Sequence, residues 1–305
     1  DHADGRAGPT CARRRDGVAP PHRPGDGSLT RPMLDPAAVL GWGASRLRDL
    51  PCRATRDPWA ILLAEVMLQQ TQATRVIPKW FELRAVFPTP DAMAEAAVGD
   101  VLRRWHGLGY PRRARNLHGA ATAIVARHAG RVPDDLDALR GLPGVGPYTA
   151  RAVLAFAFER DVAVVDTNIA RVLARVAGER LGGKEVQSFA DDLVPDGHGW
   201  LWNQVIMDLG ATVCRPAPRC DSCPVARDCR WQRAGRPAPD PATGSAAVST
   251  RQAPYAGSER ERRGRVLAAL TRGPVLVADH PPGAVASLVA DRLAVPVRVA
   301  LPLAV

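Results

Sequence analysis

Residues 142–148 and Asp166 combine residue types and spacing that suit chemistry on a phosphate-bearing partner. Gly144 and Gly146 lie between two helical patterns and allow a tight turn with positive φ and bare backbone N–H groups. The helix that follows adds unpaired N–H groups and the positive end of its dipole. Such a hairpin suits holding a nucleic-acid phosphate without reading the base sequence. Asp166, twenty residues after Gly146, could act on the nucleotide so held.

Four of the six cysteines crowd into one segment of sixteen residues. They are Cys214, Cys220, Cys223 and Cys229. This clustering favours a metal site in a reducing compartment over a disulfide framework. Four thiolates without a nearby His suit zinc or an iron–sulfur cluster. Because the segment has one C-x-x-C pair where zinc ribbons usually have two, the spacing favours 4Fe–4S. Flanking arginines indicate contact with DNA phosphates, with a purely structural staple as the alternative.

The composition is strongly basic and points to a polyanionic partner. The 305 residues carry a formal net charge of +10, and the pI is about 10.1. Nucleic acid is the usual partner of such a chain, although a solubility bias toward Arg is the simpler alternative. Lys is confined to Lys79 and Lys184. The sequence has neither an apolar run of ~20 residues nor a signal-peptide core, which predicts a cytoplasmic protein, associated with the bacterial nucleoid when on DNA, with no membrane partner.

The apolar periodicity is helical from Asp35 to about Trp231, without convincing strand alternation, and predicts an all-α fold. Asp57 is a plausible N-cap for a helix over 58–70, with Pro58 in its first turn. Further helices are predicted at 73–87, 91–105, 112–129, 134–141, 147–158, 167–178, 186–193 and 198–213. By composition, residues 1–32 are a disordered tail, 233–250 a linker, and 251–305 a small appendage with a basic helix at 258–270.

Several separate motifs make residues 50–231 similar to a known family. They are LPxR (50–53), EVMLQQT (65–71), GLGY (107–110), RNL (115–117), the hairpin, VDxN (165–168), NQ…DLGA (203–211) and the cysteines. This segment resembles the helix-hairpin-helix DNA glycosylases with an iron–sulfur loop, and most of all the MutY-type adenine glycosylases.

The resemblance implies a fold and an activity for this chain. The implied fold is a catalytic domain over 33–232, with a six-helix barrel at about 58–157 and a cluster subdomain built from about 33–57 and 158–232. A DNA cleft is expected between the two. The implied activity is removal of adenine mispaired with 8-oxoguanine or guanine, by a monomer acting on double-stranded DNA with a 4Fe–4S cluster bound.

Within that resemblance, Glu65 and Asp166 match the residues that carry out depurination. Protonation of a purine ring nitrogen improves the leaving group, and a carboxylate stabilises the cationic sugar. Glu65 lies in an apolar helix, where burial would raise its pKa and retain a proton. Asp166 is expected to stay ionised because a helix start lowers its pKa. Asn168 would orient these groups. A solvated Glu65 and a plain N-cap at Asp166 are the simpler interpretations.

Tyr148 distinguishes between reaction types. Related lyases of the endonuclease III type have a Lys at this place that forms a Schiff base with the sugar. Tyr148 therefore predicts a monofunctional glycosylase. Thymine-mismatch glycosylases of the same superfamily also have Tyr here, but Glu65 favours action on a purine. A non-catalytic DNA-binding protein is the third interpretation.

Other matched positions are expected to contact DNA. Gln69 and Gln70 correspond to the wedge that opens the duplex, and Tyr110 is expected to enter the base stack. Arg53 and Gln204 correspond to the adenine pocket.

The chain also departs from the family pattern. Cys52 replaces a common Trp, Pro111 replaces a common second Tyr, and the first cysteine gap has five residues where six is usual. Residues 251–305 do not resemble the Nudix-like domain that many members use to read 8-oxoguanine.

Overall fold

The computed structural model describes residues 34–248 and 254–296, and within them the regular structure is helical with no strand. This confirms the all-α prediction. The α-helices are α1 Pro36–Gly43, α2 Pro58–Leu68, α3 Ala73–Val86, α4 Pro90–Glu95, α5 Val98–Trp105, α6 Arg112–His128, α7 Leu136–Arg140, α8 Pro147–Ala157, α9 Thr167–Ala177, α10 Gly183–Asp191, α11 Gly199–Thr212, α12 Arg230–Arg233, α13 Glu259–Leu270 and α14 Pro282–Ala290. Short 3₁₀ turns are η1 Pro51–Ala54, η2 Cys220–Ser222 and η3 Val277–Asp279.

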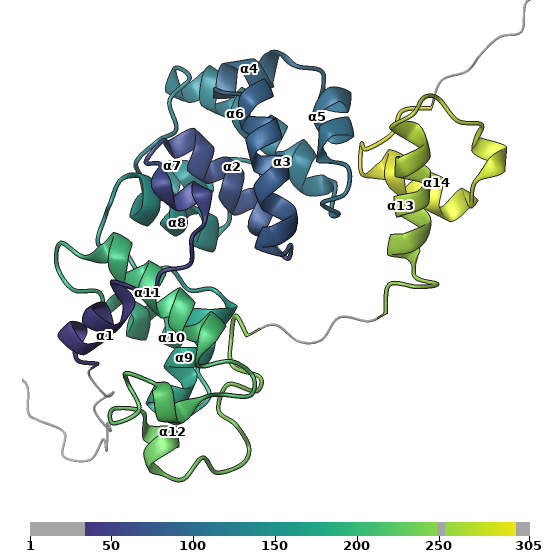
Figure 1. Cartoon of the computed structure of the whole chain (residues 1–305). Helices are drawn as coiled ribbons and strands as arrows, with labels where there is room; N and C mark the ends of the chain where they lie inside the picture. Colours follow the sequence, from purple (N-terminus) through teal and green to yellow (C-terminus); the bar gives the residue numbers. More distant parts are fainter. Residues whose placement is uncertain (1–33, 249–253, 297–305) are drawn as a thin grey trace, which may run out of the picture. The chain divides into compact units, whose positions relative to one another are not determined.

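Helix α2 is the centre of the first group of helices (Figure 1). It contacts α3, α6 and α8, and α4 in turn packs on α6. Nearly every side chain of α2 is buried, which is the property of a core helix and not of an amphipathic surface helix. Asp57 caps α2 by accepting a hydrogen bond from the Trp59 N–H at 3.0 Å, as the sequence predicts. Two buried indoles, Trp59 and Trp80, donate to backbone carbonyls and anchor the surrounding helices.

A second group of helices is built on α9 and α11. These two helices pack together, α1 lies against α11, α10 and α12 lie against α9, and α11 also reaches α8 of the first group. Gly43 permits the close approach of α1, since a Cβ there would lie 2.2 Å from a methyl carbon of Val205. The contact between α8 and α11 thus joins the first group of helices to the second.

The helix predicted at 91–105 is interrupted, so that prediction is wrong in one detail. The structure has α4 and α5 there, separated by Ala96 and Ala97 in extended conformation. The imidazole Nε2 of His118, on α6, lies 2.9 Å from the Ala96 carbonyl oxygen. Because that carbonyl is bonded to a side chain distant in sequence, periodicity alone does not reveal the break.

Residues 234–248 do not behave as the linker that composition predicts. The Asp240 carboxylate forms an ion pair of 2.6 Å with the buried Arg175 on α9, and the Ala246 N–H donates to the Leu181 carbonyl at 2.9 Å. Ser245 is buried and accepts a bond from the Leu181 N–H. Proline-rich composition suggests a spacer, but these tertiary partners fasten the segment to the second group of helices.

Residues 254–296 form a small helical unit with its own apolar cluster. Ser258 caps α13, and Val266, Ala284, Leu288 and Leu293 make up the buried cluster between α13 and α14. The basic helix predicted at 258–270 is therefore present. The tail predicted over 1–32 lies outside the described residues.

Candidate active site

Glu65 lies in the last turns of α2 and is only 8% exposed. Its Oε2 accepts a hydrogen bond of 2.9 Å from the hydroxyl of Tyr148. Burial raises the pKa of Glu65 to about 7; the negative charge of Asp166 acts in the same direction, while the Tyr148 bond and Arg53 oppose it. Glu65 is therefore a carboxyl group that still holds a proton near neutral pH, as its apolar helix predicts.

Tyr148 links this acid to the hairpin, since it is the second residue of α8. Burial raises its pKa well above the usual value, and the charges of Glu65 and Asp166 raise the pKa further. The phenol thus remains protonated and acts as a donor toward Glu65. The 2.9 Å bond joins Tyr148 to Glu65, and the negative charge of Asp166 raises the pKa values of both.

Asp166 is the N-cap of α9. Its Oδ1 accepts a bond of 2.7 Å from the Ile169 N–H, and its Oδ2 accepts one of 2.8 Å from the Asn168 side-chain amide. Burial nevertheless raises the pKa of Asp166 above its usual value. The predicted lowering of this pKa is therefore wrong, because desolvation outweighs the helix start and the two hydrogen bonds.

The side chain of Asn168 is held in place by Arg171, three residues further along α9. Its Oδ1 accepts from Arg171 at 2.8 Å, and the same guanidinium donates to the carbonyls of Gly210 and Cys214, each at 2.7 Å. Gly210 lets α11 come this close, since a Cβ there would lie 2.7 Å from the Cβ of Asn168. The orienting role predicted for Asn168 is consistent with this anchoring.

The hairpin between α7 and α8 has one left-handed glycine and not two. Gly144 has a φ of +77°, and a Cβ there would lie 2.7 Å from the Cβ of Asn116. Gly146 has a φ of −88° and is the N-cap of α8, so the positive φ predicted for it is wrong. Gly146 has no capping side chain, which leaves the first N–H groups of α8 uncapped.

The residues predicted to open the duplex lie at two neighbouring loops. Gln69 ends α2 and donates from its amide to Thr149 at 3.1 Å. Gln70 and Tyr110 both adopt positive φ, 54° and 48°, and Tyr110 is 37% exposed.

The two residues predicted for the base pocket, Arg53 and Gln204, differ in their surroundings. Arg53 donates with both terminal nitrogens to the buried Asp208, at 2.8 and 2.9 Å, and Nη1 also donates to the Arg48 carbonyl at 2.9 Å. Burial acts to raise the pKa of Asp208, yet the bonds from Arg53 and Arg48 hold it below the usual value. Gln204 lies on α11 and is 4% exposed.

Cys52 lies in η1 beside the acid. Burial raises the pKa of this thiol to about 11, and the charge of Glu65 raises the pKa further. The thiol is therefore neutral, and it supplies no aromatic surface to the site.

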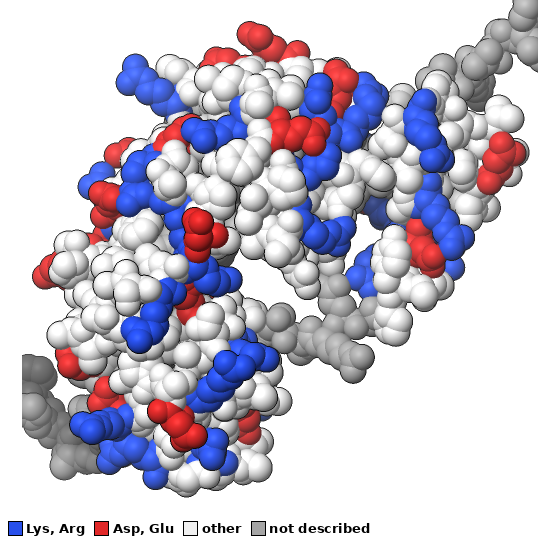
Figure 2. All heavy atoms as spheres, in the orientation of Figure 1, with Lys and Arg blue, Asp and Glu red and all other residues white. Residues whose placement is uncertain are grey.

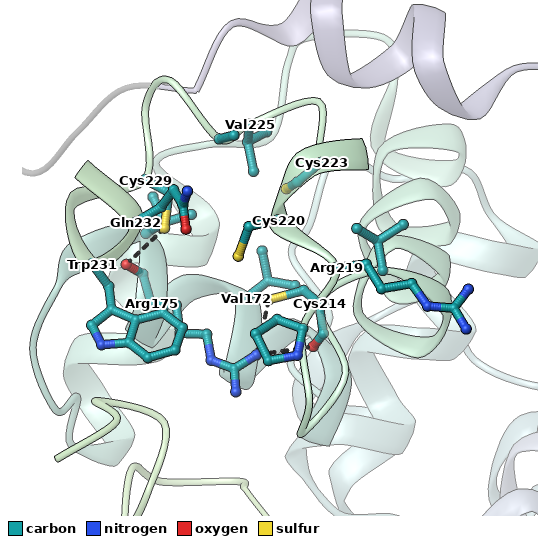
Figure 3. Close-up of a pocket in the computed structure, with 14 residues that line it drawn as sticks. Val172, Arg175, Cys214, Arg219, Cys220, Cys223, Val225, Cys229, Trp231 and Gln232 are labelled. Atoms are coloured by element: carbon teal, nitrogen blue, oxygen red, sulfur yellow. Dashed lines mark hydrogen bonds between the residues drawn. The ribbon is translucent and has the colours of Figure 1, made fainter. Parts of the chain in front are cut away.

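The four clustered cysteines line one cavity (Figure 3). The rest of the lining is mainly apolar and includes Val172, Val225 and Trp231. In Figure 3 the sulfurs of Cys214, Cys220 and Cys229 point into a common space. Throughout 34–248 and 254–296, no three Cys, His, Asp or Glu side chains are close enough to bind a single metal ion.

Basic side chains are distributed and not gathered in one stripe. Figure 2 shows Lys and Arg over all parts of the visible face, interleaved with Asp and Glu. No helix in the described residues is long and apolar enough to cross a bilayer.

Comparison with known proteins agrees with this geometry. Residues 63–195 match the model of the HhH-GPD superfamily base excision DNA repair proteins. An adenine DNA glycosylase of Mycobacterium tuberculosis is 44% identical over 258 residues, covering 81% of this chain and 82% of that protein. The chain belongs to the HhH-GPD superfamily.

Further HhH-GPD relatives extend the match to other organisms and to solved structures. The human adenine DNA glycosylase is 38% identical over 209 residues, which cover 63% of this chain and 38% of the human protein. A thermostable thymine-DNA glycosylase superposes with a TM-score of 0.61 at 30% identity, over 65% of this chain and 94% of the other. An endonuclease III–DNA complex gives a TM-score of 0.57 at 25% identity, over 64% and 92%. DNA glycosylase is accordingly the enzyme class of this HhH-GPD chain.

Sequence reasoning missed three buried arginines of this HhH-GPD domain. Arg171 and Arg175 are four residues apart on α9, in positions that otherwise carry apolar residues, and Arg113 is on α6. The signal available in the sequence was an arginine at a helix position where the periodicity calls for an apolar residue. A buried arginine at such a position requires tertiary partners.

Proposed function

We propose that this chain is a monofunctional adenine DNA glycosylase that removes adenine mispaired with 8-oxoguanine or guanine in double-stranded DNA. The observation that carries the proposal is the buried Glu65, bonded to Tyr148 and electrostatically coupled to Asp166. The naming of relatives at 44% identity as adenine DNA glycosylases supports the choice of base.

The reaction follows from the state of each group. Glu65 transfers its proton to a purine ring nitrogen, and the base then departs as a neutral molecule. The carboxylate form of Asp166, at the start of α9, lowers the energy of the cationic sugar. Asn168 keeps the Asp166 carboxylate oriented through its 2.8 Å bond. The Glu65 carboxylate then accepts a proton from the water that completes hydrolysis. The side-chain amide of Gln204, on α11, is suited to hydrogen-bond the edge of the extruded base.

A thymine-mismatch glycosylase is the second candidate because of the likeness to a solved thymine-DNA glycosylase. The two are separated by single-turnover cleavage of duplexes with adenine opposite 8-oxoguanine, adenine opposite guanine, and thymine opposite guanine. Adenine release from the first two supports the proposal. Release of thymine alone would establish the alternative, and no release of either base would overturn both.

No Schiff base is expected with substrate DNA, because Tyr148 carries no amine and the chain's two lysines, Lys79 and Lys184, lie on α3 and α10. Borohydride trapping should therefore yield no covalent protein–DNA band under conditions in which adenine is released. A Tyr148→Lys variant is the informative comparison, since it places an amine at the site. A strong trapped band with the unaltered chain would contradict the proposal.

The cysteine cavity fits a 4Fe–4S cluster held by Cys214, Cys220, Cys223 and Cys229. The donor set is four thiols that line one mainly apolar cavity, which is the ligand type that such clusters take. Such a cluster would join distant parts of the loop 214–229, in a cavity that Val172 and Arg175 of α9 also line. In this structural role the cluster would bind the four cysteine thiolates.

Purified under anaerobic conditions, the chain should contain about four irons and absorb near ~400 nm. Cys220→Ser should lose most of the iron because one corner of the cluster loses its ligand. Cys52→Ser is the matched control, since Cys52 lies outside the cavity, and it should retain the iron. Bound zinc with no iron would show that the interpretation of the cavity is wrong.

A further inference from the structure

Arg113, in the first turn of α6, joins two loops that are distant in sequence. Its residue is 9% exposed. From Nη1 it donates to three carbonyl oxygens at the end of α2, those of Val66 at 2.9 Å, Met67 at 2.8 Å and Gln69 at 2.6 Å. These are the carbonyls that a helix end leaves without partners. One guanidinium therefore fixes the point at which α2 stops and the chain turns toward Gln70.

The other terminal nitrogen holds the second loop. Nη2 donates to the carbonyls of Leu108 and Gly109, both at 3.1 Å, and to the Thr71 hydroxyl at 3.0 Å. The Thr71 hydroxyl in turn donates to the Leu108 carbonyl at 3.2 Å. The guanidinium also stacks on the Tyr110 ring, with 5.4 Å from Cζ to the ring centroid. Arg113 thus contacts the loop from which Tyr110 projects.

Both loops contain a residue in a conformation that needs external support. Gln70 and Tyr110 have φ values of 54° and 48°, which non-glycine residues rarely adopt. Such backbones cost on the order of 1–3 kcal/mol and persist where their surroundings fix them. The bonds of Arg113 fall on the residues adjacent to each, Gln69 and Gly109.

Burying this guanidinium is expensive for stability alone. Among the described residues its bonding partners are carbonyl and hydroxyl oxygens, with no carboxylate, and its Nε is buried without a partner. Burial lowers the pKa of Arg113 to about 10, so the charge remains at neutral pH. A well-packed apolar residue often serves the fold as well as a buried ion. The position therefore suggests a use beyond packing.

We infer that Arg113 is a positioning residue for extrusion of the target nucleotide: it clamps residues 69–71 and 108–110 into one rigid wedge that opens the duplex before the base is cleaved. This inference rests on the proposed function. Extruding the nucleotide costs a few kcal/mol because its base must unstack and unpair. A wedge that deforms on contact with DNA would not supply this free energy.

The test measures extrusion and cleavage separately in the full chain. A 2-aminopurine next to the target adenine, opposite 8-oxoguanine, reports unstacking by stopped-flow fluorescence, and quench-flow reports adenine release. In Arg113→Lys, one ammonium replaces the planar fork and cannot bridge both loops. The fluorescence phase should slow by about 10- to 100-fold, and adenine release from an unopposed, bulged adenine should fall by less than about threefold. Arg127→Lys, exposed in the last turn of the same helix, should match the unaltered chain.

A second variant guards against loss of the fold. Thr71→Val removes only the hydroxyl that joins Arg113 to the Leu108 carbonyl, and it should slow the fluorescence phase by about 3- to 10-fold. A normal fluorescence phase in Thr71→Val and in folded Arg113→Lys, or equal loss of release from duplex and bulge, would overturn the inference. Failure of the unaltered chain to release adenine from either DNA would instead reject the proposed function.

Discussion

Replacing Glu65 with Gln is expected to lower single-turnover adenine release by about 10²- to 10⁴-fold and, at the same time, to stabilise the folded chain near pH 8. The first effect follows because an amide has no proton of suitable acidity for the purine. The second follows because Glu65 is 8% exposed, and burial raises its pKa to about 7. A neutral side chain of equal size removes the cost of ionising a buried carboxyl group. The Tyr148 hydroxyl can still donate to the amide oxygen of Gln.

The sign of the pH dependence distinguishes this explanation from others. Below about pH 4.5 the carboxyl group of Glu65 is protonated in both folded and unfolded chains, so it does not affect stability. As pH rises to about 7 the unfolded chain ionises first, and the folded state loses on the order of 3 kcal/mol, a penalty that is complete above that pKa. Adenine release should likewise fall about tenfold per pH unit above 7, as the acid form disappears.

Thermal unfolding at pH 5 and pH 8 and single-turnover rates across this range provide the measurements. Glu95→Gln is the matched control, since Glu95 is exposed at the end of α4. It should change neither the rate nor the stability. A Glu65→Gln variant that is less stable than the unaltered chain at pH 8 would show that Glu65 is ionised and paired, not a buried acid.

Replacing Asp166 with Asn is expected to lower adenine release by about 10²- to 10³-fold while leaving the fold intact. The carboxylate charge that faces the sugar cation is lost. The helix cap is retained, because Asn is as good an N-cap as Asp and can still accept from the Ile169 N–H. Because the charge of Asp166 raises the pKa of Glu65, the remaining activity should decline at lower pH than in the unaltered chain.

The measurements are residual single-turnover rates against pH and the melting temperature of the variant. Asp35→Asn is the matched control, since Asp35 caps α1 in the same manner and lies outside the site. It should be fully active. An Asp166→Asn variant whose pH–rate profile keeps its upper limb in place would show that Asp166 and Glu65 are not coupled.

Sequence reasoning succeeded where the physical cause is local. The Asp57–Pro58 cap of α2 is a contact between neighbours in the chain, and apolar periodicity sets most helix bounds within a few residues. The raised pKa of Glu65 could be anticipated because its own helix is apolar on all sides. The predicted gathering of the cysteines required only their spacing.

The errors share a different cause, which is a partner distant in sequence. The helix predicted at 91–105 breaks at Ala96, whose carbonyl oxygen lies 2.9 Å from the imidazole of His118. The pKa of Asp166 is set by how the site encloses it, which its position at a helix start does not reveal. The roles of Arg113, Arg171 and Arg175 likewise appear only when the carbonyls they bind are brought together.

The ion pair between Arg175 and Asp240 joins α9 to a residue that lies beyond 232, the predicted end of the catalytic domain. Arg175 is 2% exposed, and it also donates to the Arg215 and Pro216 carbonyls that begin the cysteine loop. A fragment ending at residue 232 would leave an uncompensated cation in the interior, at a cost on the order of 3 kcal/mol. A fragment that keeps this ion pair must therefore extend at least to Asp240. During synthesis, this ion pair can form only after Asp240, eleven residues beyond Cys229, has left the ribosome.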